Sequence, residues 1–290
     1  LNSPPSGDVI VPVSSSDTTE GTVSPTLLTF TSADWNTPQI VTVTGVDDLI
    51  IDGNIAYTIV TDAASSADPN YNGINPADVN VSNTDDDVAG VTISPTSGLI
   101  TTEAGGTATF TVVLNNQPSG DVTLPVSSSD TTEGTVSPTS LTFTSANWNV
   151  AQTVTVTGVD DFLDDGDIAY TIVTDAASSA DPNYNGINPA DVGVTNSDDD
   201  TSGITVSPTS GLITTEAGGT ATFTVVLNSQ PSGDVIVPVS SSDTTEGTVS
   251  PTPLTFTNAN WNIAQTITVT GVDDFLDDGD IAYTIVTDAA

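Results

Sequence analysis

The sequence repeats itself with a period of 113 residues, and this repeat constrains the fold more than any other feature. The three tryptophans of the chain lie at that spacing. At the same offset, residues 90–177 and 203–290 differ at 9 of 88 positions, and residues 1–87 and 114–200 differ at 16 of 87. A unit of this length suits one independent domain and is too long for one turn of a solenoid. The chain is therefore predicted to hold about two and a half copies of one domain.

The repeat also sets the predicted domain boundaries. Residues 88–200 form one complete copy. Residues 1–87 form a partial copy without its first strands, and residues 201–290 form a partial copy without its last strand. Both ends of the sequence fall inside a copy, so we expect a slice of a longer tandem array.

The complete copy predicts an all-β fold. It carries seven short segments rich in Val, Ile and Thr, often alternating, and bounded by Gly, Pro, Asn or Asp, with no helical period. Seven such strands in one domain predict an antiparallel, immunoglobulin-like β-sandwich, repeated in tandem as a rod or fibre. The expected core side chains are Phe110, Leu114, Leu141, Phe143 and Tyr170. The expected strands are 91–94, 107–114, 122–128, 140–144, 153–159, 168–174 and 192–195.

The composition excludes several classes of function. The chain has no Lys, Arg, His, Cys or Met, and its 38 acidic residues give a net charge of −38. Nucleic-acid binding through a basic patch is excluded because phosphate contacts draw chiefly on Lys and Arg. Disulfides, zinc sites and catalytic triads are excluded because they need Cys or His. No apolar stretch approaches the ~18 residues of a membrane span, so we expect no membrane insertion in this segment.

The acidic residues gather where strands end. If successive strands alternate in direction, the loop before the second strand and the ends of the third, fifth and seventh strands lie at one pole of the sandwich. The chain passes into the next domain at that same pole. The carboxylates expected there are Glu103, Asp130, Asp160, Asp161, Asp164, Asp165, Asp167, Asp198, Asp199 and Asp200.

These carboxylates predict a metal site at each domain junction. Two like charges 4 Å apart repel by about 4 kcal/mol at a surface-like dielectric, and the chain holds no cationic side chain to offset this. All-oxygen ligands select a hard cation, and a flexible cluster suits Ca²⁺ better than Mg²⁺. A solvated acidic surface without ions is the alternative. The matching acids are Asp17, Asp47, Asp48, Asp52, Asp85, Asp86 and Asp87 in the first copy and Glu216, Asp243, Asp273, Asp274, Asp277, Asp278 and Asp280 in the third.

One junction departs from this pattern. Ile51 and Asn54 stand where the complete copy has Asp164 and Asp167. We expect that junction to hold fewer ions or to bind them more weakly. The role of the loop 181–188 stays open: it supplies oxygen ligands to the preceding junction, or it is a plain Asx-rich turn.

The order of the acidic motifs resembles the Calx-beta family. The motifs are Glu103-Ala-Gly-Gly, Ser128-Ser-Asp, Leu141-Thr-Phe-Thr, Val154-Thr-Val-Thr-Gly-Val-Asp-Asp and the run Asp198-Asp-Asp. They are also similar to immunoglobulin-like repeats of giant bacterial surface proteins. The resemblance implies calcium at the end of the domain, bound by Glu103, Asp130, Asp160, Asp161, Asp165 and Asp198 to Asp200, and in the next copy by Glu216, Asp243, Asp273, Asp274 and Asp278.

Two functions follow as hypotheses. The first is a structural array of a bacterial surface or biofilm-matrix protein, stiffened by calcium between neighbouring repeats, with lateral self-association or a homopolymer left open. The second is an adhesin whose repeats contact carbohydrate, ice or a protein partner. Trp148 distinguishes them, because it either caps the core or faces a ligand. We expect no enzyme, since carboxylates that recur at every linker do not resemble a glycosidase centre.

Overall fold

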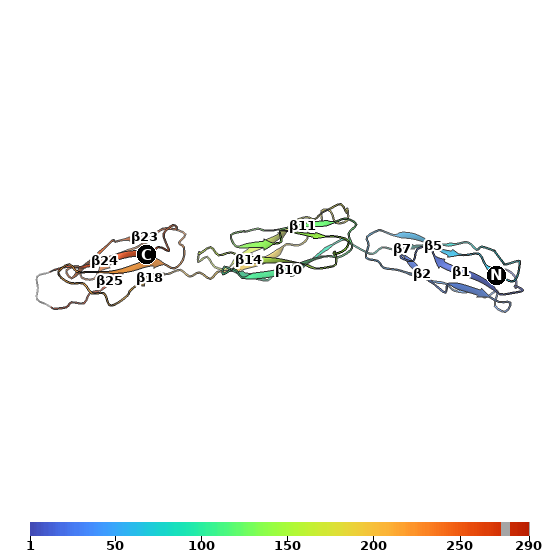
Figure 1. Ribbon diagram of the computed structural model, residues 1–290, viewed down its shortest axis with the longest axis horizontal. Helices are drawn as coiled ribbons and strands as arrows, with labels where there is room; N and C mark the ends of the chain where they lie inside the picture. Colours follow the sequence, from blue (N-terminus) through green and yellow to red (C-terminus); the bar gives the residue numbers. More distant parts are fainter. Residues whose placement is uncertain (274–278, 290) are drawn as a thin grey trace.

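The computed structural model describes residues 1–273 and 279–289, and every regular element within them is a β-strand. Strands β1 to β7, β8 to β17 and β18 to β25 form three units, here called the first, second and third units. Figure 1 shows the three units in a row along the long axis, each running lengthwise. In the described part of the chain, no helix of a length and apolarity that would span a membrane occurs.

The second unit is a sandwich of two sheets. One sheet has the order β12 (Gly134–Ser137), β14 (Gln152–Gly158), β10 (Thr107–Leu114), β8 (Val91–Ser94). The other has the order β13 (Ser140–Phe143), β11 (Val122–Ser128), β15 (Ile168–Thr174), β17 (Val192–Ser197), β9 (Leu99–Thr102), and β16 (Ser178–Ser179) also pairs with β11. The predicted all-β sandwich class is confirmed.

The strand count differs from the seven expected, because short segments add three strands. The chain leaves β8, turns through Gly98 at a φ of +77°, and enters the other sheet as β9, which lies parallel to β17. Glycine adopts this left-handed conformation at no steric cost. All other pairings between the strands of this unit are antiparallel. The parallel pair matters for function, since it brings the residue after β9 beside the residues after β17.

The core lies between the two sheets and confirms the five predicted core residues. Phe110, Leu114, Leu141, Phe143 and Tyr170 are each at most 6% exposed. Alternation of buried and more exposed positions along β10, β13 and β15 explains their placement, since successive side chains of a strand point to opposite faces. Trp148 is half-buried and packs against this core.

The flanking units repeat parts of this architecture. The first unit comprises β1 (Val9–Ser15), β2 (Gly21–Ser24), β3 (Leu27–Phe30), β4 (Thr42–Gly45), β5 (Ile55–Thr61), β6 (Ser65–Ser66) and β7 (Val79–Asn83). The third comprises β18 (Ile204–Ser207), β19 (Thr220–Leu227), β20 (Val235–Val237), β21 (Val239–Ser241), β22 (Gly247–Ser250), β23 (Leu254–Phe256), β24 (Gln265–Gly271) and β25 (Ile285–Thr287). The register of β24 on β19 matches that of β14 on β10.

Replacing Phe143 with alanine tests the core of the second unit. Phe143 is 0% exposed, so Phe143→Ala should lower the free energy of unfolding of this unit by about 3–5 kcal/mol, through lost burial and a cavity. Hydrogen exchange of the β11 and β13 amides in the full chain measures the loss. Val150→Ala is the control, because Val150 is 58% exposed and its truncation should cost no more than about 0.5 kcal/mol. Equal protection in the two variants would contradict the assigned core.

Candidate metal centre

Three carboxylates from separate segments meet at one end of the second unit. Glu103 follows β9 in a tight turn, Asp160 follows β14, and Asp200 follows β17. One carboxylate oxygen from each lies within 4.8 Å of the others. Glu103 is only 3% exposed, whereas Asp160 is exposed and Asp200 is half-buried. These three predicted residues are therefore brought together as donors around one point.

The electrostatics of this cluster are unfavourable without a cation. Burial raises the pKa of Glu103 to about 7, and the charges of Asp198 and Asp161 act in the same direction. Its Oε2 accepts one long hydrogen bond, from the Asp199 amide at 3.4 Å. Burial and the charge of Asp160 raise the pKa of Asp200 as well. Among the described residues, Asp200 Oδ2 is buried and has no hydrogen-bond partner, although buried polar atoms nearly always have one.

A second acidic cluster lies next to the first and includes a residue that the sequence did not predict. Glu133, Asp161 and Asp165 also bring one oxygen each within 4.8 Å of one another. Glu133 is 6% exposed, and burial raises its pKa. Asn196 donates to its Oε2 at 3.4 Å. The first unit repeats this cluster with the matching residues Glu20, Asp48 and Asp52.

A signal for Glu133 was present in the sequence. The chain has five Glu against 33 Asp, and all five occupy only two positions of the repeat. One position holds Glu103 and Glu216, and the other holds Glu20, Glu133 and Glu246. Because Glu occurs only at these two positions, each was a candidate for a site that the shorter Asp side chain does not reach.

Several predicted ligands instead accept hydrogen bonds from nearby protein groups. Asp130 Oδ1 accepts from the Thr132 amide and hydroxyl at 3.0 and 2.5 Å, and these bonds lower its pKa. Asp17 and Asp243 make the same turn. Asp198 accepts from the amides of Gly166 and Asp200 at 2.7 Å each. For these residues calcium ligation stays a prediction.

Two further predicted ligands hold the acidic loop in place. Asp167 accepts from the Ser197 hydroxyl at 3.0 Å and from the Asp198 amide at 3.2 Å. The matching Asn54 accepts from the Asp85 amide at 3.1 Å, so an uncharged side chain makes the same hydrogen bond to the backbone at this position. Asp164 accepts from Ser202 in the linker to the third unit.

The acids after β7 sit together at the end of the first unit. Burial raises the pKa of Asp87, and Asp47, Asp85 and Asp86 repel its charge. The side-chain Nδ2 of Asn116, in the second unit, donates to Asp87 Oδ1. Asp85 accepts from the Gly53 and Asp87 amides.

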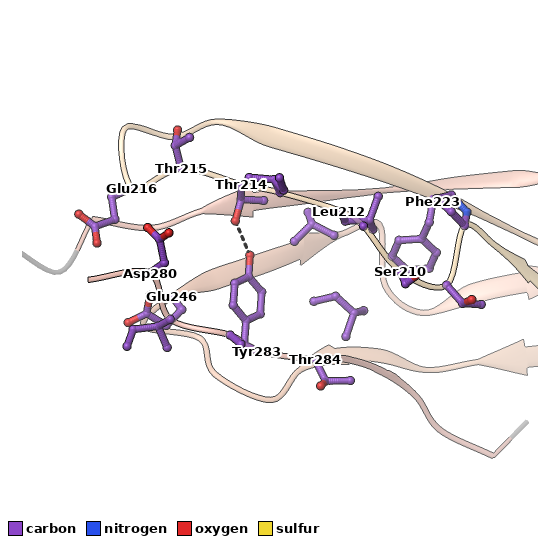
Figure 2. Close-up of a pocket in the computed structure, with 18 of the residues that line it drawn as sticks. Ser210, Leu212, Thr214, Thr215, Glu216, Phe223, Glu246, Asp280, Tyr283 and Thr284 are labelled. Atoms are coloured by element: carbon purple, nitrogen blue, oxygen red, sulfur yellow. Dashed lines mark hydrogen bonds between the residues drawn. The ribbon is translucent and has the colours of Figure 1, made fainter. Parts of the chain in front are cut away.

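A groove lies along one side of the described part of the third unit. It has a volume of about 1060 Å³ and lies between Leu212–Thr215 and residues 281–285. In the second unit the matching space holds β17, paired with β15 and β9. Figure 2 shows Glu216, Glu246 and Asp280 at one end of the groove and the hydrogen bond between Tyr283 and Thr214 within it.

Glu216 is exposed, whereas its counterpart Glu103 is buried. Of the remaining acids predicted for this copy, Asp273 and Asp280 are described as exposed, and Asp274, Asp277 and Asp278 lie outside the described residues.

The loop 181–188 is explained by contacts within its own unit. Tyr184 is 0% exposed, and its hydroxyl accepts from the Asn116 amide and donates to the Asn116 carbonyl. Asp181 is 3% exposed and accepts from the amides of Ser119 and Asn183 at 2.8 Å each. These bonds favour the Asx-turn alternative over ligation of an ion.

Comparisons with known proteins give only distant similarities. No protein-family model matches this sequence, and no curated protein matches it. One similar structure is the calcium binding domain CBD12 of CALX1.1, at 20% identity over 63% of this chain and 76% of that one, with a TM-score of 0.31. Another is the S-layer protein SbsC, domains 4 and 5, at 17% identity over 65% and 70%, with a TM-score of 0.30. Because these scores are low, the fold and the site rest on the strand pairings and distances above.

The raised pKa of Glu103 predicts a pH dependence of stability. Between pH 4.5, the ordinary pKa of Glu, and about 7, the folded chain holds this proton more tightly than the unfolded chain. In chelator, the melting temperature of the second unit should therefore fall as the pH rises through this window. Glu103→Gln should reduce the fall, and Asp121→Asn, which removes an exposed carboxylate outside the clusters, should leave it unchanged. A melting temperature that rises with pH in the parent chain would contradict the prediction.

Proposed function

We propose that this chain is part of a structural array of β-sandwich units that calcium ions stiffen at their ends. One observation carries the proposal: Glu103 is buried beside Asp200, whose Oδ2 has no hydrogen-bond partner among the described residues, in a chain without a single Lys, Arg or His. Buried carboxylates need a proton or a cation. At neutral pH and above, a bound cation becomes the stabilising choice.

The chemistry of the donors supports calcium. The two clusters of the second unit offer carboxylate oxygens from six residues, and neither contains nitrogen or sulfur ligands. Ca²⁺ takes six to eight oxygen ligands in variable geometry, whereas Mg²⁺ requires a near-ideal octahedron and keeps its water. Asp160 and Asp161 are adjacent in the chain and belong to different clusters, so ions bound at the two clusters would share one strand end.

The proposed mechanism is electrostatic. Without ions, the acidic strand ends repel one another and the end of the unit loosens. With ions, Glu103, Asp160 and Asp200 are drawn together, and the last of these leads directly into the linker to the third unit. Calcium would in this way hold together the end of the unit from which the linker leaves.

The proposed setting is the outside of a bacterial cell, as a surface stalk or a matrix fibre. A chain without Lys or Arg offers no tryptic sites, and one without Cys or Met lacks the main targets of oxidation. Its partners would be calcium ions and neighbouring repeats, and we assign it no enzymatic activity. The adhesin alternative is less favoured because Trp148 and Trp261 are half-buried against their cores.

Thermal melting of the full chain in calcium, magnesium and chelator tests the proposal. At calcium one hundredfold above its Kd, one site adds about 2.7 kcal/mol, which raises the melting temperature of a domain of this size by roughly 10 °C. Glu103→Gln and Asp200→Asn should each abolish most of that rise, while Asp121→Asn should retain it. Coincident melts in all three solutions at matched ionic strength would show that the acids are only solvated charge.

A further inference from the structure

The second and third units are joined by direct contacts from the acidic loop 160–167. The Phe162 carbonyl accepts from the Gln230 amide at 2.8 Å, and the rings of Phe162 and Trp261 lie 6.1 Å apart. Asp164 Oδ2 accepts from the amide and the hydroxyl of Ser202 at 2.8 and 2.5 Å. We call these contacts the second joint. They involve protein groups alone.

The joint between the first and second units has the same backbone hydrogen bond at the equivalent position. Leu49 stands at the position of Phe162, and its carbonyl accepts from the Gln117 amide at 3.1 Å. Leu49 and Phe162 have φ values of +62° and +65°, which non-glycine residues seldom adopt because of steric cost. Both described copies of this position have the same conformation and the same backbone hydrogen bond, so the two joints share one backbone arrangement.

The side chains at the two joints differ as matched pairs. The second joint pairs Asp164 with Ser202, and the first has Ile51 and Ala89 at these two positions, both half-buried. Between the two joints, the carboxylate that accepts two hydrogen bonds and the serine that donates them are both replaced by apolar residues. Either mixed pair loses the hydrogen bond between the two side chains: Asp with Ala lacks the hydroxyl donor, and Ile with Ser lacks the carboxylate acceptor.

A second pair changes in the same comparison. At the first joint, Asn116 donates to Asp87 across the boundary between the units. At the second joint, the matching residues are Ser229 and Asp200, and in the described part of the chain Asp200 Oδ2 has no partner. Among the described residues of the second joint, Ser229 makes no bond to Asp200 that corresponds to the one from Asn116 to Asp87, and Asp200 is part of the cluster with Glu103. The two joints therefore differ at both pairs of positions.

We propose that loop and linker form a matched recognition interface, by which the end of one unit selects the beginning of the next. The second joint has a hydrogen-bonded pair, Asp164 and Ser202, and the first joint has two apolar residues, Ile51 and Ala89, at the same positions of the same backbone arrangement. Asp164 is a positioning residue that holds the linker. This inference does not rest on calcium binding, because its contacts form between protein groups.

A double-mutant cycle with distance measurements tests this interface in the full chain. The chain has no Cys, so spin labels can be placed cleanly at Thr135→Cys and Thr248→Cys, two exposed and equivalent strand positions in the second and third units. In chelator, the parent chain should give one narrow distance peak. Asp164→Ile and Ser202→Ala should each lose that peak, and the double variant, which recreates the pair of the first joint, should restore it.

Each other outcome overturns the proposal. A broad distribution in the labelled parent would show that protein groups alone do not hold the joint. A narrow peak in both single variants would show that the pair is not part of the interface, and a double variant as broad as the singles would show that the pairs are not matched. Labels at Thr22→Cys and Thr135→Cys report on the first joint, which all three variants should leave unchanged. Because no ion is present, failure here is separable from failure of the calcium proposal.

Discussion

Repulsion between buried carboxylates, with no cationic side chain anywhere in the sequence, is the constraint on which the rest of this structure depends. Most folded acidic proteins offset such charges with Lys, Arg or His. Here Glu103 is buried near Asp160, Asp161, Asp198 and Asp200, and only amide and hydroxyl donors are available from the chain. The acids that find such donors, such as Asp130, become turn residues. In the two clusters, Glu103 and Glu133 each accept one long hydrogen bond at 3.4 Å, and Asp200 Oδ2 has no partner among the described residues.

The sheet topology creates this convergence. Glu103 reaches the end of β17 only because β9 leaves the sheet of β8 and pairs in parallel with β17. Glu103 is buried at the point where this parallel pair ends, and burial is the main cause of its raised pKa. Strand pairing, burial of the glutamate and its raised pKa are therefore linked, and a cation bound at the cluster would stabilise the closed sandwich.

Much of the architecture follows from the sequence, because alternation along strands such as β10 identifies the buried face and strand direction places Asp160 and Asp200 at one end. Glu133 could not be placed in that way, since it lies five residues beyond the end of β11, in a turn whose position over the sheet depends on tertiary contacts. The sequence also cannot show that Asp130 and Asp164 are already engaged by Thr132 and Ser202. Local hydrogen bonds decide which members of an acidic run remain available.

The central claim is that the two clusters at the end of the second unit hold calcium, and locating the ions by anomalous scattering tests it most directly. Crystals of the full chain grown with calcium should give anomalous difference peaks between Glu103, Asp160 and Asp200 and between Glu133, Asp161 and Asp165, with oxygen distances of about 2.3–2.6 Å. Well-ordered clusters without such peaks, or peaks only at exposed acids elsewhere on the surface, would contradict it.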